Sequence, residues 1–163
     1  MGNIRVRIFS IERVQNVDHW KDYASKRNRL VERLGYCHEV TTVFHGTRAH
    51  NPEDIFKGQR SFDVLVSGEG AYGRGAYFAR DASVSHGYAH PTSDGYYQML
   101  VAKVLLGNAK DCRHNRRKRS LVMREQDGIV EQYDSILGVL GTPIYIVHRN
   151  DQSYPAYCIT YTC

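Results

Sequence analysis

The chain has 163 residues, a formal net charge of +5 at pH 7, 42% hydrophobic residues and 24% charged residues. These values are typical of one globular domain, so they exclude an intrinsically disordered chain. The sequence contains no run of about 18 apolar residues and no apolar block near its N-terminus, so we expect neither a membrane span nor a secretory signal peptide.

The first predicted elements are a strand and a long helix. Apolar residues alternate with polar residues from Ile4 to Val14, which predicts the strand. The helix is expected to begin after Asp18, as its N-cap, and to end near Gly35. Its apolar face is expected to carry Trp20, Tyr23, Leu30 and Leu34.

The middle of the chain is predicted to alternate short strands, short helices and one loop. The β-branched and aromatic run 40–44 predicts a strand that ends beside His45. Asn51 and Pro52 begin a short helix that Gly58 ends. The four glycines of residues 61–75 predict a loop, although the apolar run Phe62 to Val66 within it has the composition of a strand.

The second half of the chain is predicted to be mainly β-structure. The last expected elements are a strand 76–79, a short helix capped by Asp81 that carries Ser85 and Tyr88, a long strand 96–106, a charged loop or hairpin 111–120, and strands 144–147 and 157–161 joined by a turn around Asn150-Asp151 and Pro155. Because strands dominate and the helices cluster early, we predict an α+β fold in a single domain over residues 1–163.

Three separated motifs carry most of the functional information. Phe44-His45-Gly46-Thr47 is followed by Gly73-Arg74-Gly75-Ala76-Tyr77-Phe78-Ala79, and then by Ser83-Val84-Ser85-His86-Gly87-Tyr88. A cleft with one histidine, exposed backbone at glycines and a serine between two tyrosines can hold a flat aromatic amide such as nicotinamide. The motifs therefore indicate an NAD-consuming site.

The same residue types also occur in ordinary structural positions. A lone histidine such as His45 is usually a core residue, and single tyrosines such as Tyr77 and Tyr88 usually are too, but their setting in a longer pattern favours a site. Gly68 to Gly73 matches GxGxxG, yet a dinucleotide-binding turn must open a helix, and the glycines and aromatics that follow are poor helix formers.

Taken together, the motifs resemble the catalytic domain of the diphtheria-toxin-like ADP-ribosyltransferases, the poly(ADP-ribose) polymerase group, in its mono-ADP-ribosylating branch. The resemblance covers almost the whole chain from about Ile4, and it includes Asp151-Gln152-Ser153-Tyr154-Pro155. It implies the ADP-ribosyltransferase fold, with two packed, mainly antiparallel sheets around an NAD cleft and short flanking helices. It also implies NAD as the co-substrate.

The resemblance implies roles for the motif residues. His45 matches the histidine that hydrogen-bonds the 2′-hydroxyl of the nicotinamide-side ribose. Gly46 matches the residue whose backbone grips the carboxamide, and Ser85 matches the serine whose hydroxyl also meets it. Tyr77 and Tyr88 match the aromatic pair that stacks on the nicotinamide ring. Such stacking and hydrogen bonding would fix the ring for attack on the glycosidic carbon.

Three further positions complete the implied site. Thr47 approaches the adenosine side, and Tyr72, in the donor-site loop 61–72, either contacts NAD or is a simple loop aromatic. Ile144 falls where polymer-forming members of the family have a glutamate. Since isoleucine cannot activate a ribose hydroxyl, chain elongation should fail. Glu69 and Glu131 are candidate substitute carboxylates, with solvated surface positions as the alternative.

We therefore predict a mono-ADP-ribosyltransferase that moves one ADP-ribose unit from NAD to a protein, including itself, or to a terminal phosphate. One alternative is an inactive NAD-binding module. Another is a nucleic-acid-directed transferase that uses the basic residues between Arg113 and Arg119, although these residues also fit a solvated loop.

The remaining expectations concern metals, partners and location. His86 with His90, and Cys112 with His114, lack further ligands nearby, so no metal is expected. The first strand begins at once, which leaves no room for the helical regulatory subdomain of some relatives. Four scattered cysteines without a CxxC pair indicate reduced thiols, and we expect a monomer in the cytoplasm or nucleus, without membrane attachment.

Overall fold

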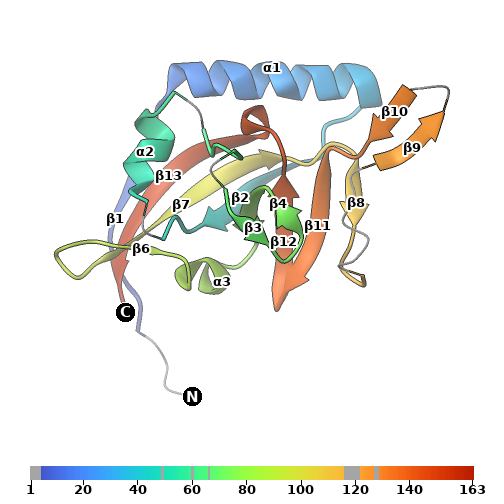
Figure 1. Ribbon diagram of the computed structural model, residues 1–163. Coiled ribbons are helices and arrows are strands. Elements are labelled where there is room, and N and C mark those ends of the chain that lie inside the picture. The colour runs from blue at the N-terminus through green and yellow to red at the C-terminus, as the bar shows by residue number, and fades with distance from the viewer. Residues whose placement is uncertain (1–4, 49, 60, 66, 116–121, 127–128) are drawn as a thin grey trace.

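The computed structural model describes residues 5–48, 50–59, 61–65, 67–115, 122–126 and 129–163, with the backbone alone for 122–126, 129 and 130. β-strands are the most frequent regular structure in this part of the chain, and the long helix α1 lies across one side of the main sheet (Figure 1). The predicted α+β class and ADP-ribosyltransferase fold are confirmed.

The elements follow one another along the chain with short connections. The helices are α1 (Val17–Leu34), α2 (Pro52–Lys57), α3 (Ala82–His86) and the 3₁₀ turn η2 (Asn150–Gln152). The strands are β1 (Arg7–Arg13), β2 (Glu39–His45), β3 (Glu69–Gly70), β4 (Gly73–Arg74), β5 (Ala76–Ala79), β6 (His90–Pro91), β7 (Tyr97–Leu105), β8 (Ala109–Asp111), β9 (Val122–Gln126), β10 (Ile129–Gln132), β11 (Ser135–Leu140), β12 (Thr142–Val147) and β13 (Ser153–Thr162).

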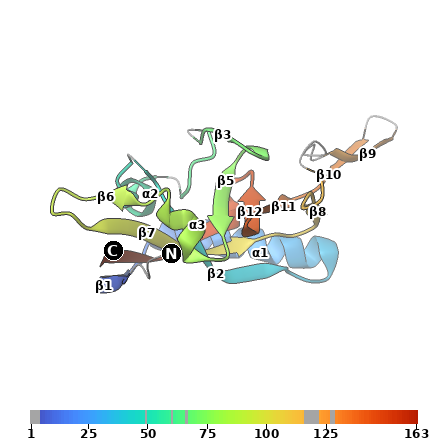
Figure 2. The ribbon, with the colours of Figure 1, turned by 90° about the horizontal axis from the view of Figure 1, so that it is seen from below.

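The main sheet has two halves that meet at a narrow seam between β2 and β5. Its strand order is β1-β13-β7-β2-β5-β12-β11-β8, with β6 beside β7, and only the β8–β11 pair of these is parallel. At the seam, β2 and β5 share one residue pair, Phe44 with Ala79. Figure 2 shows β5 and β12 turned away from the plane of β7. The two expected sheets are thus linked into one hydrogen-bonded path.

Helix α1 is held by capping at both ends and by a buried apolar side. The side-chain oxygen of Asn16 accepts hydrogen bonds from the backbone N–H groups of Asp18 and His19, at 3.1 and 3.0 Å. Asn16 is therefore the N-cap, and the prediction of Asp18 was wrong by two residues, since Asp18 lies in the first turn instead. Gly35, at φ 76°, ends the helix as predicted.

The apolar side of α1 packs on β7 and β13. Tyr23 and Leu30 are buried against Leu105, Tyr154 and Ala156, as the helical periodicity predicted. Trp20 instead remains 45% exposed. The packing fixes α1 against β7 and β13. No helix of the described chain is long and apolar enough to cross a bilayer.

Phe62 to Leu65 forms turns, in agreement with the predicted loop and against the strand-like composition of this run, since the Asp63 carboxylate accepts the N–H of Leu65 and Phe62 has a φ of +36°; Val66 lies outside the described residues. Two local predictions were wrong. Tyr88 follows α3 and does not belong to it. Pro155 lies inside β13, where the pairing with β7 shifts register, and a bulge is where a strand tolerates proline.

Candidate active site

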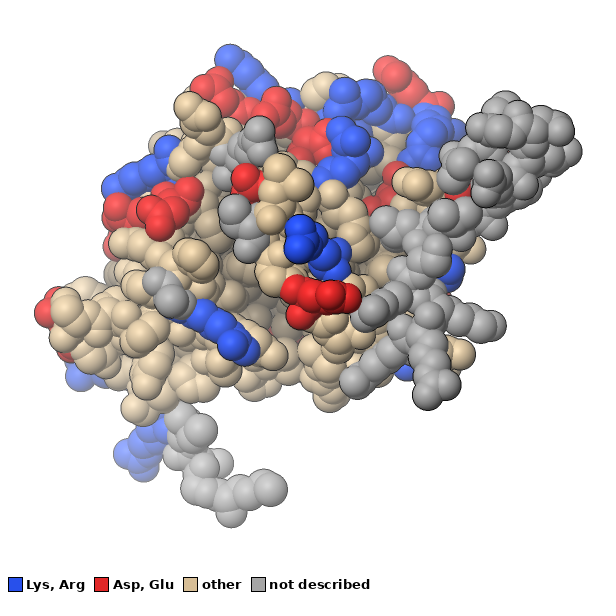
Figure 3. Space-filling view, in the orientation of Figure 1, with Lys and Arg blue, Asp and Glu red and all other residues tan. Residues whose placement is uncertain are grey.

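A cavity of about 760 Å³ lies at the seam of the sheet. Its walls come from the end of β2, the segment 46–55 with part of α2, the loop and hairpin 62–71, β5, α3 with Tyr88 after it, and β12. On the face of the molecule in Figure 3, Lys, Arg, Asp and Glu side chains gather along α1 at the top, whereas the surface below is mostly uncharged apart from a few charged side chains near its centre. Among the predicted site residues, the cavity is lined by His45, Gly46, Thr47, Tyr77, Ser85, Tyr88 and Ile144.

His45 is the last residue of β2, and its ring bridges the seam. Its Nδ1 lies 2.7 Å from the backbone oxygen of Tyr77 on β5. Because a carbonyl oxygen only accepts, Nδ1–H donates, and Nε2 of the neutral ring is left as an acceptor. Burial lowers the pKa of His45, an effect that the bond to Tyr77 partly opposes. The ring contacts Phe62 edge to face, at 5.0 Å between centroids.

Gly46 makes the close backbone approach that the motif predicted. A β-carbon here would overlap the carbonyl group of Tyr88 and lie 2.6 Å from the backbone oxygen of Ser85. Only glycine fits without a shift of this backbone. The contact brings Ser85, which is 4% exposed, and Tyr88 to the end of β2. Tyr88 also has the Arg48 guanidinium 4.2 Å above its ring centroid.

The Tyr77 hydroxyl is held by the β3–β4 hairpin. It donates to the backbone oxygen of Gly73 and accepts the N–H of Tyr72 at 2.9 Å. A β-carbon on Gly70 would come within 2.6 Å of the Tyr77 ring, so the hairpin backbone lies directly against this ring. The ring therefore has a fixed position on the cavity wall.

Ile144 shares a face of the sheet with Tyr77. In the β5–β12 register, Ile146 pairs with Tyr77 and Ile144 pairs with Ala79, so the side chains of 144 and 146 point the same way as that of Tyr77. Ile144 is only 2% exposed and packs with Ala79 and Ile136. An apolar, well-packed side chain thus lies on the same cavity wall as Tyr77.

The sequence profile of the poly(ADP-ribose) polymerase catalytic domain matches residues 1–163, which is the whole chain. The chain belongs to this family. A protein of Dictyostelium discoideum named probable poly [ADP-ribose] polymerase is 37% identical over 160 residues, which are 94% of this chain and 44% of that protein. Two human relatives are named as mono-ADP-ribosyltransferases.

Human protein mono-ADP-ribosyltransferase PARP12 is 33% identical over 158 residues, which are 93% of this chain and 21% of that protein. Human protein mono-ADP-ribosyltransferase PARP11 is 32% identical over 181 residues, which are 96% of this chain and 52% of that protein. The chain therefore spans about half or less of the length of these relatives, and the match identifies a catalytic domain of this family.

Thr47 and Tyr72, both predicted as contacts of NAD, lie in different surroundings. Thr47 lines the cavity, but its hydroxyl donates to the backbone oxygen of His50 at 2.6 Å. Tyr72 is 1% exposed and does not line the cavity. Its ring packs on Gly138, and its hydroxyl bonds the backbone N–H of Val139 at 3.0 Å. Tyr72 therefore anchors the hairpin on β11, as a loop aromatic.

Carboxylates reach the cavity from the loop and from α2. Glu69, on β3, lines it, whereas Glu131 lies exposed on β10 outside it. Asp54 and Asp63 line it as well, and neither was found from the sequence. Asp54 was unremarkable because acidic residues are expected in the first turn of any helix, so its position carried no functional signal.

The other sequence features receive no support as sites. The described residues contain no group of three or more His, Cys, Asp or Glu side chains that could hold a metal. Gly68 to Gly73 forms the β3–β4 hairpin and opens no helix, which fits no dinucleotide-binding turn. In the basic segment, Arg113 pairs with Asp111 at 2.6 Å, and residues 116–119 lie outside the described chain.

Proposed function

We propose that this domain is a mono-ADP-ribosyltransferase that transfers one ADP-ribose unit from NAD to a protein acceptor and releases nicotinamide. The observation that carries the proposal is Ile144, an apolar side chain buried on the cavity wall of a poly(ADP-ribose) polymerase family domain. The cavity retains groups to bind NAD, but position 144 has none to deprotonate a ribose hydroxyl for elongation.

Each wall of the cavity has a task in binding NAD. The free Nε2 of His45 accepts a hydrogen bond from the 2′-hydroxyl of the nicotinamide-side ribose, since its Nδ1 is committed to Tyr77. The backbone of Gly46 and the hydroxyl of Ser85 hold the carboxamide. Tyr77 and Tyr88 enclose the nicotinamide ring, and the hairpin contact keeps the first of them in place.

The transfer breaks the bond between the ribose C1′ and the pyridinium nitrogen, whose electron pair leaves with neutral nicotinamide. An acceptor nucleophile attacks C1′ from the opposite side and loses its proton. The transition state has oxocarbenium character, which a carboxylate would stabilise. With Ile144 on the wall, the domain contributes mainly fixed orientation, and Glu69 is the candidate carboxylate that lines the same cavity.

Incubation with labelled NAD tests the proposal. Intact mass should rise by single ADP-ribose units on separate acceptor sites, with equimolar release of nicotinamide and no polymer ladder. Tyr77→Ala should lose this activity. Tyr157→Ala, which removes a 41% exposed tyrosine of β13 outside the cavity, should keep it. Binding of NAD by calorimetry without nicotinamide release over hours would instead identify an inactive binding module.

A further inference from the structure

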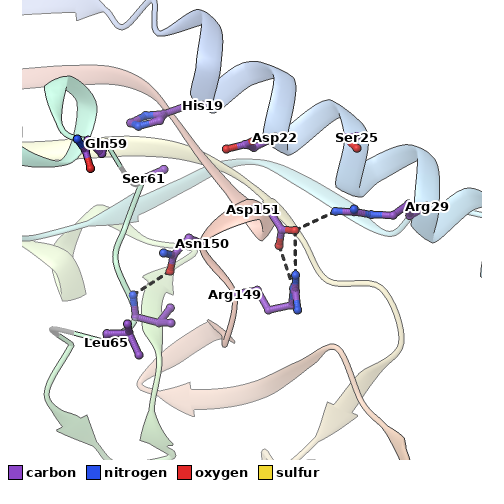
Figure 4. A pocket seen from close by; sticks show the side chains of 11 residues that line it. His19, Asp22, Ser25, Arg29, Gln59, Ser61, Leu65, Arg149, Asn150 and Asp151 are labelled. Carbon is purple, nitrogen blue, oxygen red and sulfur yellow. Dashed lines mark hydrogen bonds and ion pairs between the residues drawn. The ribbon is translucent and has the colours of Figure 1, made fainter.

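A second cavity, of about 570 Å³, lies between α1, the segment 59–65 and the turn 149–151 (Figure 4). It shares no lining residue with the cavity at the seam. Its size is within the range of small-molecule sites. The described residues that face it are mostly polar or charged. The two ends of the cavity differ in chemistry.

One end of this cavity is basic. Arg29 of α1 and Arg149 both pair with a single carboxylate, that of Asp151, at 3.0 and 3.2 Å (Figure 4). A guanidinium group has five N–H donors. Two guanidinium groups that share one carboxylate therefore keep unused donors, and together the three groups carry one positive charge. The two arginine side chains are 59% and 63% exposed, which lets these donors reach an incoming anion. Phosphate suits such a fork.

The other end offers hydrogen-bond acceptors. The carboxylate of Asp22 has no hydrogen-bond or ion-pair partner within the described residues. His19 is 4% exposed, and its Nε2–H donates to the backbone oxygen of Gly58 at 2.9 Å, which makes its Nδ1 an acceptor. This Nδ1 is itself buried and lacks a partner in the described chain. The exposed carboxylate of Asp22 is therefore the acceptor at this end that a ligand group with N–H donors can reach.

The two ends have a defined spacing along α1. Asp22 and Arg29 are separated by seven residues, about 10 Å at the helical rise of 1.5 Å per residue. Ser25 lies between them on the helix, and Val64 and the 66% exposed Leu65 are the apolar residues of the lining, on the facing segment (Figure 4). A ligand that spans the two ends must therefore be anionic at one end and carry N–H donors at the other, and Val64 and Leu65 can contact its apolar part.

We propose that this cavity binds a guanosine monophosphate-type nucleotide, with its phosphate on Arg29 and Arg149 and its base edge on Asp22. Guanine presents two neighbouring N–H donors on one edge, which pair with both oxygens of a carboxylate. Adenine presents a donor beside an acceptor nitrogen, and that nitrogen would face the Asp22 lone pairs. The site therefore selects guanine over adenine.

The position of this cavity connects it with the NAD cavity through one segment. Ser61, Val64 and Leu65 face the guanine nucleotide site, while Phe62 and Asp63 line the cavity at the seam. Phe62 in turn contacts the ring of His45. The inference rests on the second cavity alone and holds whether or not the domain transfers ADP-ribose.

Calorimetry on the full chain with saturating nicotinamide, which occupies the seam, tests the proposal. Guanosine 5′-monophosphate should bind one per chain. Adenosine 5′-monophosphate, guanosine and inorganic phosphate should each bind at least about tenfold more weakly, because each lacks one of the two charge-assisted contacts. No binding of the guanine nucleotide, or equal binding of inorganic phosphate, would overturn the proposal.

Variants locate the binding on the second cavity. Arg149→Ala should weaken the guanine nucleotide about tenfold, and Asp22→Asn should remove the preference for guanine over adenine. Arg27→Ala is the matched control, because Arg27 lies on the same helix and pairs with Glu39 at 3.6 Å, outside the cavity. Equal loss in Arg27→Ala and Arg149→Ala, with both variants folded by circular dichroism, would show that no specific site exists.

Discussion

The two cavities of this domain are built from opposite kinds of residue. The cavity at the seam combines aromatic rings, closely packed glycine backbone and a histidine whose pKa is lowered by burial. The cavity beside α1 combines exposed guanidinium and carboxylate groups. The comparison teaches that the first depends on backbone positions that tolerate no change, while the second depends on side chains that a surface can gain or lose one at a time.

The largest effect on activity should come from a substitution that alters the seam cavity and leaves the α1 cavity unchanged. Gly46→Ala places a methyl group against the Tyr88 carbonyl and 2.6 Å from the Ser85 oxygen. The backbone there must move by about an ångström, and such misplacement at a reacting centre costs about 100-fold in rate. Nicotinamide release from NAD should fall by at least about that factor, while guanosine monophosphate binding stays unchanged.

The neighbouring Gly87 gives the control for this prediction. A β-carbon on Gly87 meets its nearest neighbour, the Val84 oxygen, at an ordinary 3.7 Å, and its φ of −61° suits any residue. Gly87→Ala should therefore keep the parent rate. If Gly46→Ala also kept it, the close contact of 46 with 85 and 88 would have no role in holding nicotinamide.

The second prediction concerns the buried wall of the seam cavity. Ile144→Glu puts a carboxylate where the present side chain is 2% exposed and packs with Ile136, so the variant should lose about 3 kcal/mol of unfolding free energy. Ile144→Val should lose only about 1 kcal/mol. Urea unfolding measures both.

Ile144→Glu should not by itself produce polymer, since elongation also needs a groove that binds ADP-ribose as the acceptor. A ladder of long products from this single change, seen by gel electrophoresis after incubation with NAD, would refute that expectation.

Gly46 and Ile144 also show how far the sequence could predict the site. His45, Gly46, Tyr77 and Ser85 lie in short motifs whose residue types indicate a binding site, so their meeting at one cavity was predictable from the sequence. Ile144 followed from the alignment of one strand. The α1 cavity was not predictable, because its residues come from three distant segments and a charged helix face usually faces only water.

The fold was predictable where periodicity is strong and not where a turn interrupts it. The long strand β7 and both ends of α2 agree with the predictions. The run from Phe62 has the composition of a strand, yet Asp63 forms a turn with its own side chain, and the segment is the loop that its glycines predicted. β11 was missed because Gly138 breaks its pattern, and the structure shows why glycine is needed: a β-carbon there would lie 2.7 Å from the Tyr72 ring.

The third prediction concerns pH at the seam. Burial lowers the pKa of His45, so its ring stays neutral at pH values where a free histidine, with a pKa of about 6.5, is half protonated. Protonation would turn Nε2 into a donor and remove the acceptor for the ribose hydroxyl. The acid limb of kcat/KM for nicotinamide release should therefore lie below pH 6.5, with a tenfold fall per pH unit beyond it.

The lowered pKa of His45 also makes the stability of the folded chain depend on pH. The unfolded chain takes up a proton at His45 near pH 6.5, whereas the folded chain does so only at lower pH, so this group destabilises the native state as pH falls through the unfolded value. His45→Gln should lack both the limb and this part of the acid destabilisation. An unchanged limb in His45→Gln would assign it to another group.

The smallest expected effect is a difference between the two cavities in how ligand affinity depends on ionic strength. Nicotinamide is uncharged and meets rings and a neutral imidazole, so raising NaCl from about 0.05 to about 0.5 M should leave its affinity within about twofold. Guanosine monophosphate meets exposed guanidinium groups, whose attraction salt screens, so its affinity should fall severalfold over the same range. Calorimetry at several salt concentrations measures both. Equal salt dependence would mean that charge does not distinguish the cavities, because the anion end of the α1 cavity would then contribute no more than the aromatic seam.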